Sequence, residues 1–503
     1  MTPSMVFTQN GGTLSLREIP QHAPDRFAQA LLSALSGGWR VVSYFGVQAD
    51  DGVRLYCLLS FKSHATIGVM STLVTGNSFY SLTTEAPQLH LFEREIAEQF
   101  SLDPEGHPWP KPVRFAPALG SLPGVTPHRP PTIGIMDFYR VEGDEVHEVA
   151  VGPVHAGIIE PGHFRFQCFG EEVMHLEVSL GYQHRGVERM MQGRPGERMR
   201  KLAETMAGDT TIGHGTAYAM IVEALTSTAP PARAQAVRGI ALELERLANH
   251  TGDLGAISGD VGYLPTASFC GRIRGDFLNM TAGICGSRFG RDLVVPGGVA
   301  FDLSVDGARQ LADRIRTARD EVTNAIDLLW DTPSVLARLE GTGVVNEQTA
   351  LELGLVGPAA RASGLNRDIR RDHPFGIYSM SQIPVETGKT GDVYARTMVR
   401  WLEMEKSLDF IEEQLAQLPG GATRRAVGEV SGECLAVALT EGWRGEVCHV
   451  ALTDARGAFF RYKVTDPSFH NWSGLAMALR GGQISDFPLC NKSFNLSYCG
   501  VDL

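Results

Sequence analysis

The spacing of apolar residues along the chain changes in a way that predicts where helices and strands lie. Residues 25–35 are spaced as in a helix, whereas 41–47 and 53–61 are apolar runs on either side of an Asp-Asp-Gly sequence. Such a sequence between two apolar runs is typical of a hairpin turn. Residues 91–100 return to helical spacing. We therefore expect a small α+β unit at the N-terminus.

Three carboxylates lie within the predicted helix 91–100, namely Glu93, Glu95 and Glu98. Helical spacing places most of them on the face opposite the apolar stripe. Because the charged face of an amphipathic helix is usually solvated, we predict that these glutamates face water and take no part in catalysis.

A proline-rich stretch follows and marks a domain boundary. Eight prolines lie between residues 108 and 131, which disfavours both regular helix and central strand. We therefore divide the chain into an N-terminal domain over 1–125, a linker with a first hairpin over 126–150, and a large domain over 151–503.

The large domain begins with short apolar-polar alternation and then changes to helical spacing. The pattern predicts one hairpin over 133–151 about Gly143 and another over 163–180 about Gly170. Long amphipathic stretches follow, at 231–250, 304–329 and 391–415. The predicted fold class is α+β, with a small N-terminal α+β domain followed by a mainly α-helical bundle domain with short peripheral β hairpins.

Composition narrows the classes of function. The 503 residues are 43% apolar and 20% charged, with a net charge of −12 and no basic cluster, so we expect no nucleic-acid partner. No apolar run reaches the roughly 18 residues of a spanning helix, and the start does not resemble a secretion signal. We therefore expect a chain that neither spans a membrane nor is secreted.

The cysteines and two glycine-rich sequences exclude several cofactor sites. Eight cysteines are scattered without a CxxC pair, which favours reduced thiols and gives no support for an iron–sulfur cluster in this chain. Gly388-Lys389-Thr390 lacks the earlier glycine of a phosphate loop, because position 383 is Ile383. Gly341-Thr342-Gly343 has Asn346 where a dinucleotide fingerprint needs glycine, and no HExxH zinc motif occurs.

Ordered blocks in the large domain resemble those of a known family. The blocks are Gly152-Pro153-Val154-His155, Glu160-Pro161-Gly162-His163, Gly181-Tyr182-Gln183-His184-Arg185-Gly186-Val187-Glu188, His214-Gly215-Thr216-Ala217-Tyr218, Glu243-Leu244-Glu245-Arg246-Leu247 with His250, Arg361-Ala362-Ser363-Gly364 with Arg370, Asp372, His373 and Pro374, and Gly391-Asp392-Val393. Together they resemble the large subunit shared by respiratory complex I, where it is the 49 kDa (D) subunit, and the membrane-bound energy-converting nickel–iron hydrogenases. The order of the blocks is far more specific than any one of them.

The N-terminal domain resembles the complex I 30 kDa (C) subunit. This likeness depends on Phe92-Glu93-Arg94-Glu95 and Glu105-Gly106-His107-Pro108. The fusion of a 30 kDa-like with a 49 kDa-like unit is the layout of the formate hydrogenlyase type of large subunit.

The resemblance implies that this chain holds no nickel–iron centre. Hydrogenases of the family bind the metals through four thiolates, and soft sulfur ligands are what such a centre requires. The corresponding positions here are Ala207, Thr210, Ser497 and Gly500, with Cys499 one place short of the last. We therefore expect no metal site, no cofactor in this chain, and no hydrogenase activity.

The resemblance also implies that the usual quinone contacts of complex I are missing. The histidine and tyrosine between which the headgroup is held correspond here to Ile159 and Gly208. Quinone remains a partner to be tested, and its reduction at the usual place is doubtful.

Ionisable residues around the same place are the remaining candidates for chemistry. Glu160 resembles the glutamate that relays protons away from the metal in hydrogenases, and with His155 it is our candidate catalytic pair for a proton relay. The alternative for Glu160 is a turn cap before Pro161 that touches solvent, and for His155 and His163 a structural hydrogen-bonding role.

Two further groups of ionisable residues allow two interpretations each. His184, Arg185 and Glu188 are either an internal ion-pair network or the lining of a proton channel. Arg361, Arg370 and Asp372 are expected to form another such network, with a direct functional role as the alternative.

The resemblance implies a function with one alternative. The chain is interpreted as the large subunit of a membrane-associated complex I-like, hydrogenase-related oxidoreductase complex, in which electron transfer is coupled to ion translocation. The expected partners are a small iron–sulfur subunit carrying the cluster and integral membrane antiporter-like subunits, with this chain peripheral on the cytoplasmic side. The alternative is a non-catalytic structural or coupling subunit of such a complex, and a true nickel hydrogenase is disfavoured.

Overall fold

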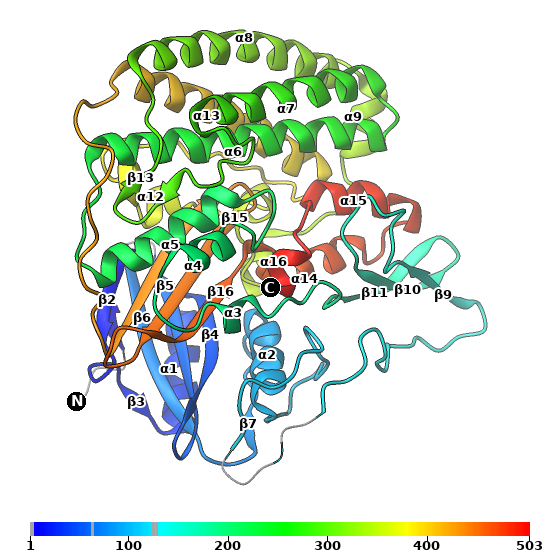
Figure 1. Cartoon of the computed structure of the whole chain (residues 1–503). Helices are drawn as coiled ribbons and strands as arrows, with labels where there is room; N and C mark the ends of the chain where they lie inside the picture. The colour runs from blue at the N-terminus through cyan, green and yellow to red at the C-terminus, as the bar shows by residue number, and fades with distance from the viewer. Residues whose placement is uncertain (1–4, 62–64, 123–125, 127–128) are drawn as a thin grey trace.

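The computed structural model describes residues 5–61, 65–122, 126 and 129–503, and its N-terminal part is a sheet with helices against it (Figure 1). The sheet has the order β1-β6-β5-β4, with β3 parallel to β6. Its elements are β1 (Val6–Thr8), β3 (Gln21–His22), α1 (Pro24–Ser36), β4 (Arg40–Ala49), β5 (Gly52–Phe61), β6 (Thr66–Val74) and α2 (His90–Phe100). The predicted helices and the hairpin about Asp50-Asp51 are confirmed, since Ala49 pairs with Gly52.

A second sheet lies against the first, and the sequence pattern named none of its strands. Its order is β16-β15-β14-β2. The strands are β2 (Gly12–Ser15), β14 (Cys434–Gly442), β15 (Gly445–Thr453) and β16 (Phe459–Thr465). Leu435 and Val437 share a core with Phe45 of the first sheet, whereas Ala436 and Ala438 share one with helix α5. Both faces of these strands are therefore covered.

Long helices form a bundle above the second sheet (Figure 1). They are α5 (Thr211–Leu225), α6 (Ala232–Asp260), α7 (Leu264–Cys285), α8 (Val305–Trp330) and α13 (Val393–Ala416). The amphipathic stretches predicted at 231–250, 304–329 and 391–415 are thus confirmed as α6, α8 and α13. The fold is α+β, as expected.

One of the two predicted hairpins of the large domain does not form. The strands β10 (His163–Phe169) and β11 (Glu172–Ser179) make the hairpin about Gly170, as predicted. The segment before Gly143 contains no strand in its described part, so the hairpin over 133–151 is wrong. The strand β9 (Val146–Val151) pairs antiparallel with β10 instead, because the described residues before Gly143 form no strand and β10 offers free backbone donors and acceptors after it.

The remaining elements are short. They are β7 (Ser78–Tyr80), η2 (Pro87–Leu89), β8 (Asp103–Glu105), α3 (Val187–Met190), α4 (Glu197–Ala203), β12 (Val294–Val295), β13 (Gly298–Val299), α9 (Pro333–Leu339), α10 (Glu347–Glu352), α11 (Gly357–Ala362), α12 (Ile369–Asp372), η3 (Gly376–Ser379), α14 (Pro467–Leu479), η4 (Ile484–Asp486), α15 (Phe487–Phe494) and α16 (Cys499–Asp502). Among the described helices, none combines the length and apolar character needed to cross a bilayer.

The prediction that the glutamates of α2 face water is wrong. Glu93 and Glu95 are buried, and the half-buried Glu98 accepts hydrogen bonds from backbone amides of the proline-rich segment. Glu95 forms ion pairs with Arg114 and, at 2.6 Å, with Lys463 of β16. The polar face of α2 is buried because three segments cover it: β16 meets Glu95, residues 81–83 meet Glu93, and the proline-rich segment meets Glu98.

Lys463 is the centre of a buried charge network that joins three segments. Its ammonium also lies 3.1 Å from the Glu188 carboxylate of α3, which pairs in turn with Arg461 at 2.9 Å. These cations lower the pKa of Glu188 although burial alone would raise it. The network therefore fixes α2 and α3 against β16.

Replacing Lys463 with methionine should lower the free energy of unfolding by about 3–5 kcal/mol, because two buried carboxylates lose a shared cation. Chemical denaturation of the purified chain measures the change. The matched control is Arg309→Met on α8. The ion pair of Arg309 with Asp306 is 3.7 Å long and mostly exposed, so this substitution should change the free energy of unfolding by no more than about 0.5 kcal/mol. Equal effects of the two substitutions would contradict a supporting role for the network.

Candidate functional site

The four positions that correspond to the family's thiolates lie in two segments that meet. Ala207 and Thr210 are in the turn before α5, and Ser497 and Gly500 are at the start of α16. Arg185 joins the two segments by donating to the carbonyl of Met206 at 2.9 Å and to that of Cys499 at 3.3 Å. The resemblance therefore points to one place in the structure, which we call the central site.

The side chains at the central site do not suit a thiolate-bound metal. A Cβ atom at Gly500 would lie 2.7 Å from the Asp466 carboxylate, so a cysteine there would require Asp466 to move. The Ser497 hydroxyl accepts a hydrogen bond from the Gly500 amide at 2.9 Å. In the residues that the structure describes, no group of three or more His, Cys, Asp or Glu side chains is arranged to hold a metal ion.

A row of four hydrogen-bonded side chains runs from the central site into the second sheet. The Asp466 Oδ2 atom lies 3.1 Å from Nε2 of His214, whose Nδ1 lies 3.0 Å from Nε2 of His449. The other nitrogen of His449 lies 2.8 Å from the Tyr462 hydroxyl. All four are buried, and burial together with His214 lowers the pKa of His449 well below its ordinary value. Hydrogen-bonded imidazoles in a row can pass a proton from one end to the other.

Sequence reasoning found only one member of this row. His214 lies in a block that carries the resemblance, whereas Asp466, His449 and Tyr462 were not singled out. Asp466 also accepts a hydrogen bond from the Ser468 amide at 2.8 Å and so caps α14. The sequence Asp-Pro-Ser at 466–468 is a recognisable helix start, and it is the signal that could have drawn attention to Asp466.

Glu160 lies at the central site and caps α16. Its carboxylate accepts hydrogen bonds from the backbone amides of Tyr498 at 3.1 Å and Cys499 at 3.3 Å. Burial and the charge of Glu160 raise the pKa of the Cys499 thiol to about 12, so this thiol stays protonated at neutral pH. The structure thus brings a half-buried carboxylate beside a thiol at the place that the resemblance indicates.

The two histidines of the neighbouring loop support its backbone. The ring of His155 lies 2.9 Å from the Gly162 carbonyl and that of His163 lies 3.3 Å from the Gly152 carbonyl, so each can donate to it. In the described part of the chain, no hydrogen bond joins His155 to Glu160. The relay through this pair remains a prediction, and the contacts of both histidines agree with the structural alternative.

Of the residues His184, Arg185 and Glu188, only Glu188 takes part in an ion-pair network. Glu188 belongs to the network around Lys463, as the ion-pair interpretation predicted. His184 instead lies 2.7 Å from the Asp502 carbonyl, and Arg185 donates to backbone carbonyls. These two residues therefore hold the C-terminus in place.

The second expected network is present, with a different arrangement of partners. Arg361 pairs with Glu403 at 2.7 Å and with Glu441 at 2.9 Å. Arg370 pairs with Asp368 at 2.6 Å, while Asp372 pairs with Arg371 at 2.7 Å. The groups other than Arg371 and Asp372 are nearly inaccessible to water.

Comparison with known proteins identifies the class to which this fold and central site belong. The family model for the respiratory-chain NADH dehydrogenase 49 kDa subunit matches residues 260–434. The chain is 30% identical over 436 residues to formate hydrogenlyase subunit 5 of Escherichia coli K12, which covers 84% of this chain and 76% of that protein. It is 32% identical over 357 residues to the carbon monoxide-induced hydrogenase of Rhodospirillum rubrum, covering 69% of this chain and 97% of the relative.

The fold is also found in a solved assembly. A chain of the membrane-bound sulfane sulfur reductase, an archaeal respiratory membrane complex, superposes with a TM-score of 0.67 at 25% identity and covers 73% of this chain and 100% of its own length. The class is therefore that of hydrogenase-like large subunits of membrane respiratory complexes. This chain belongs to the family of the complex I 49 kDa subunit and the hydrogenase large subunits.

A carboxylate beside the central site holds its proton unusually tightly. Glu245 of α6 is buried and accepts hydrogen bonds from the amides of Ile212 at 2.7 Å and Gly213 at 3.2 Å. Burial, reinforced by the nearby charge of Asp209, raises the pKa of Glu245 to about 8.

The contribution of Glu245 to stability should therefore depend on pH. With a folded-state pKa above the ordinary value of 4.5, its contribution is fully present below about pH 4.5 and is lost as pH rises towards about 8. Because Glu245→Gln does not titrate, the free energy of unfolding of wild type minus that of this variant should fall as pH rises over that range. Denaturation at several pH values measures this difference, with the exposed Glu340→Gln as the control, for which it should stay constant. A difference for Glu245→Gln that stays constant or rises with pH would refute the raised pKa.

Proposed function

We propose that this chain is the large subunit of a membrane-associated, complex I-like and hydrogenase-related oxidoreductase complex, without a nickel–iron centre of its own. The observation that supports the proposal is the composition of the central site in a chain that keeps the family fold. At the positions where the resemblance expects thiolates, the Asp466 carboxylate lies against Gly500, and the Ser497 hydroxyl accepts a hydrogen bond from the Gly500 amide. Within this proposal, electron transfer in the complex is coupled to ion translocation.

The proposal includes partners that the relatives suggest. The membrane-bound relatives and the fused layout support a small iron–sulfur subunit as electron carrier and antiporter-like subunits in the membrane. In this proposal the N-terminal domain occupies the position of the 30 kDa subunit in the complex. The whole chain is a peripheral subunit on the cytoplasmic side of the membrane. Quinone is disfavoured at the usual place, because Ile159 and Gly208 offer no side-chain donor.

The alternative is a coupling subunit that performs no redox chemistry. The observation that favours it is the set of hydrogen bonds at the central site, where Asp466 and Ser497 are each engaged by the chain itself. Such a site transmits movement or protons between partners without binding a substrate. The two proposals share the same complex and differ in the chemistry at the central site.

Within both proposals, Glu160 is the candidate proton relay. It is half-buried beside the loop that carries the exposed Ile158, and its carboxylate reaches the amides at the start of α16. A titratable group between surface and central site is what a proton path requires.

Isolation of the tagged chain from membranes of its own host tests the proposed complex. The chain should co-purify with an iron–sulfur subunit and integral membrane subunits, and should contain far less than one nickel per chain, because alanine, threonine, serine and glycine cannot supply the thiolates. A chain that is wholly monomeric and absent from membranes would refute the complex. About one nickel per chain, or hydrogen evolution, would refute the altered centre.

Glu160→Gln tests the relay, because glutamine keeps the size of the side chain and abolishes its titration. Turnover of the complex should fall about 10²-fold or more at normal complex yield. The matched control is Glu171→Gln in the exposed β10–β11 turn, which should leave turnover unchanged. If Glu160 has only its capping role, the yield of the complex falls while each assembled complex keeps near-normal turnover, and the relay is then rejected.

A further inference from the structure

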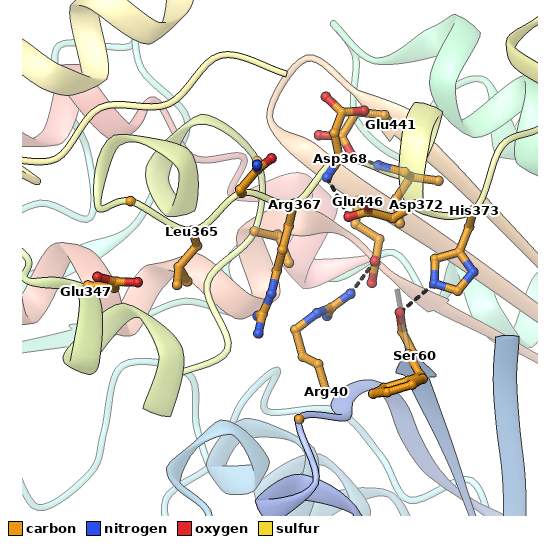
Figure 2. A pocket seen from close by; sticks show the side chains of 17 residues that line it. Arg40, Ser60, Glu347, Leu365, Arg367, Asp368, Asp372, His373, Glu441 and Glu446 are labelled. Atoms are coloured by element: carbon orange, nitrogen blue, oxygen red, sulfur yellow. Dashed lines mark hydrogen bonds and ion pairs between the residues drawn. The ribbon is translucent and has the colours of Figure 1, made fainter. Parts of the chain in front are cut away.

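A charged cavity of about 460 Å³ lies between the N-terminal sheet and the segment that carries the Arg361 network (Figure 2). Arg40 of β4 and Ser60 of β5 line it from one side, and Arg367 and Asp372 line it from the other. Glu446 of β15 completes the wall. The cavity is separate from the central site, since its lining contains none of the residues assigned there.

Most charges around the cavity are neutralised by ion pairs. Asp368 pairs with Arg370, Glu441 pairs with Arg361, and Asp372 pairs with Arg371. His373, the remaining titratable group packed against this wall, has its Nε2 atom 2.7 Å from the Ser60 hydroxyl. Glu347 lines the cavity near Gly364 and is exposed to water.

Arg367 is the exception. Among the described residues its guanidinium has neither a carboxylate partner nor a hydrogen-bond acceptor, and its Nη1 atom is inaccessible to water. Figure 2 shows the side chain extending into the cavity towards Arg40. Burial, together with the charge of Arg40, lowers the pKa of Arg367 to about 10, which means that this environment disfavours its charge. An anion in the cavity would reverse that effect.

Glu446 offers the complementary unpaired atom. Its side chain is only 3% exposed, one carboxylate oxygen pairs with Arg40, and the other, Oε1, has no partner in the described residues. A buried carboxylate oxygen without a donor costs free energy that a ligand donor can recover. The cavity therefore presents an unpaired cation on the half-buried Arg367 and an unpaired acceptor on the buried Glu446, from different segments.

We propose that this cavity binds a small oxyanion that also carries a hydrogen-bond donor. The oxyanion would lie against the fork of Arg367, whose geometry matches two oxygens of a carboxylate or phosphate. A hydroxyl of the same ligand would donate to Oε1 of Glu446. Hydroxycarboxylates and phosphates with a protonated oxygen share this chemistry, and a volume of 460 Å³ is within the usual range of small-molecule sites.

The position of the site gives the ligand a structural consequence. Arg40 belongs to the N-terminal sheet, Glu446 to the second sheet, and Arg367 to the segment before α12. A ligand held by Arg367 and Glu446 would connect the segment before α12 to the second sheet, next to the ion pair by which Glu446 holds Arg40 of the first sheet. The inference does not depend on the proposed function of the central site, and its test measures binding only.

Calorimetric titration of the full-length chain with inorganic phosphate and, separately, with malate tests the proposal. At least one of the two should bind at millimolar concentration or below, and binding of one alone identifies the source of the oxyanion. Arg367→Gln should weaken binding about tenfold or more, because a two-point charged contact is lost. Arg309→Gln on α8, which removes one exposed arginine far along the chain, should leave binding unchanged.

Two outcomes would overturn the proposal. One is the absence of binding by both probes, and the other is equal binding by wild type and Arg367→Gln, which would place the anion elsewhere. Arg367→Gln is expected to fold, since Arg367 makes no side-chain hydrogen bond to the described residues. Arg367→Lys is the second variant: it keeps the charge and loses the fork, so it should also bind more weakly, and equal binding would overturn the assigned geometry.

Discussion

The structure depends on the neutralisation of charges that folding removes from water. Lys463 shows this most directly, because one ammonium serves Glu95 of α2 and Glu188 of α3 in a place where neither carboxylate reaches solvent. A buried ion without a partner costs several kcal/mol, so these three segments are stable only together. In the same way, Arg361 of α11 neutralises the buried carboxylates of Glu403 on α13 and Glu441 on β14, where these three elements meet. The N-terminal part is therefore held by electrostatics as well as by its apolar core.

The central site shows how such a scaffold can keep its form while its chemistry changes. Thiolates bound to metal ions and a hydrogen-bonded Asp466–His214 pair both satisfy buried groups, but only the first creates a redox centre. Arg185 joins the two segments of the central site through backbone carbonyls, which do not depend on side-chain identity. Titratable groups that can hold a proton, Asp466 and His214 among them, lie at the site.

The number of faces that a helix or strand of this chain buries helps to explain whether the sequence predicted it. Helix α8 has one apolar stripe, so its period was visible in the sequence, and it formed as predicted. Strands β14 and β15 are buried on both faces, so apolar and polar residues do not alternate along them. The sequence pattern therefore predicted neither these strands nor a role for His449 on β15. Glu95 of α2 was misplaced because its partner Lys463 comes from a distant part of the chain. The resemblance located the central site, but the role of Asp466 there required the structure.

The pairing of β2 with β14 has a consequence for how the protein is made. Ser15 pairs with Cys434, so β2 has to wait until the much later β14 has been synthesised before the two strands can pair. Contacts of such long sequence separation slow folding, and an unpaired strand edge invites association with other chains in the meantime. The same pairing means that splitting the gene at the proline-rich segment would separate the strands of one sheet. Because both strands lie in one chain, they are produced together and in equal number.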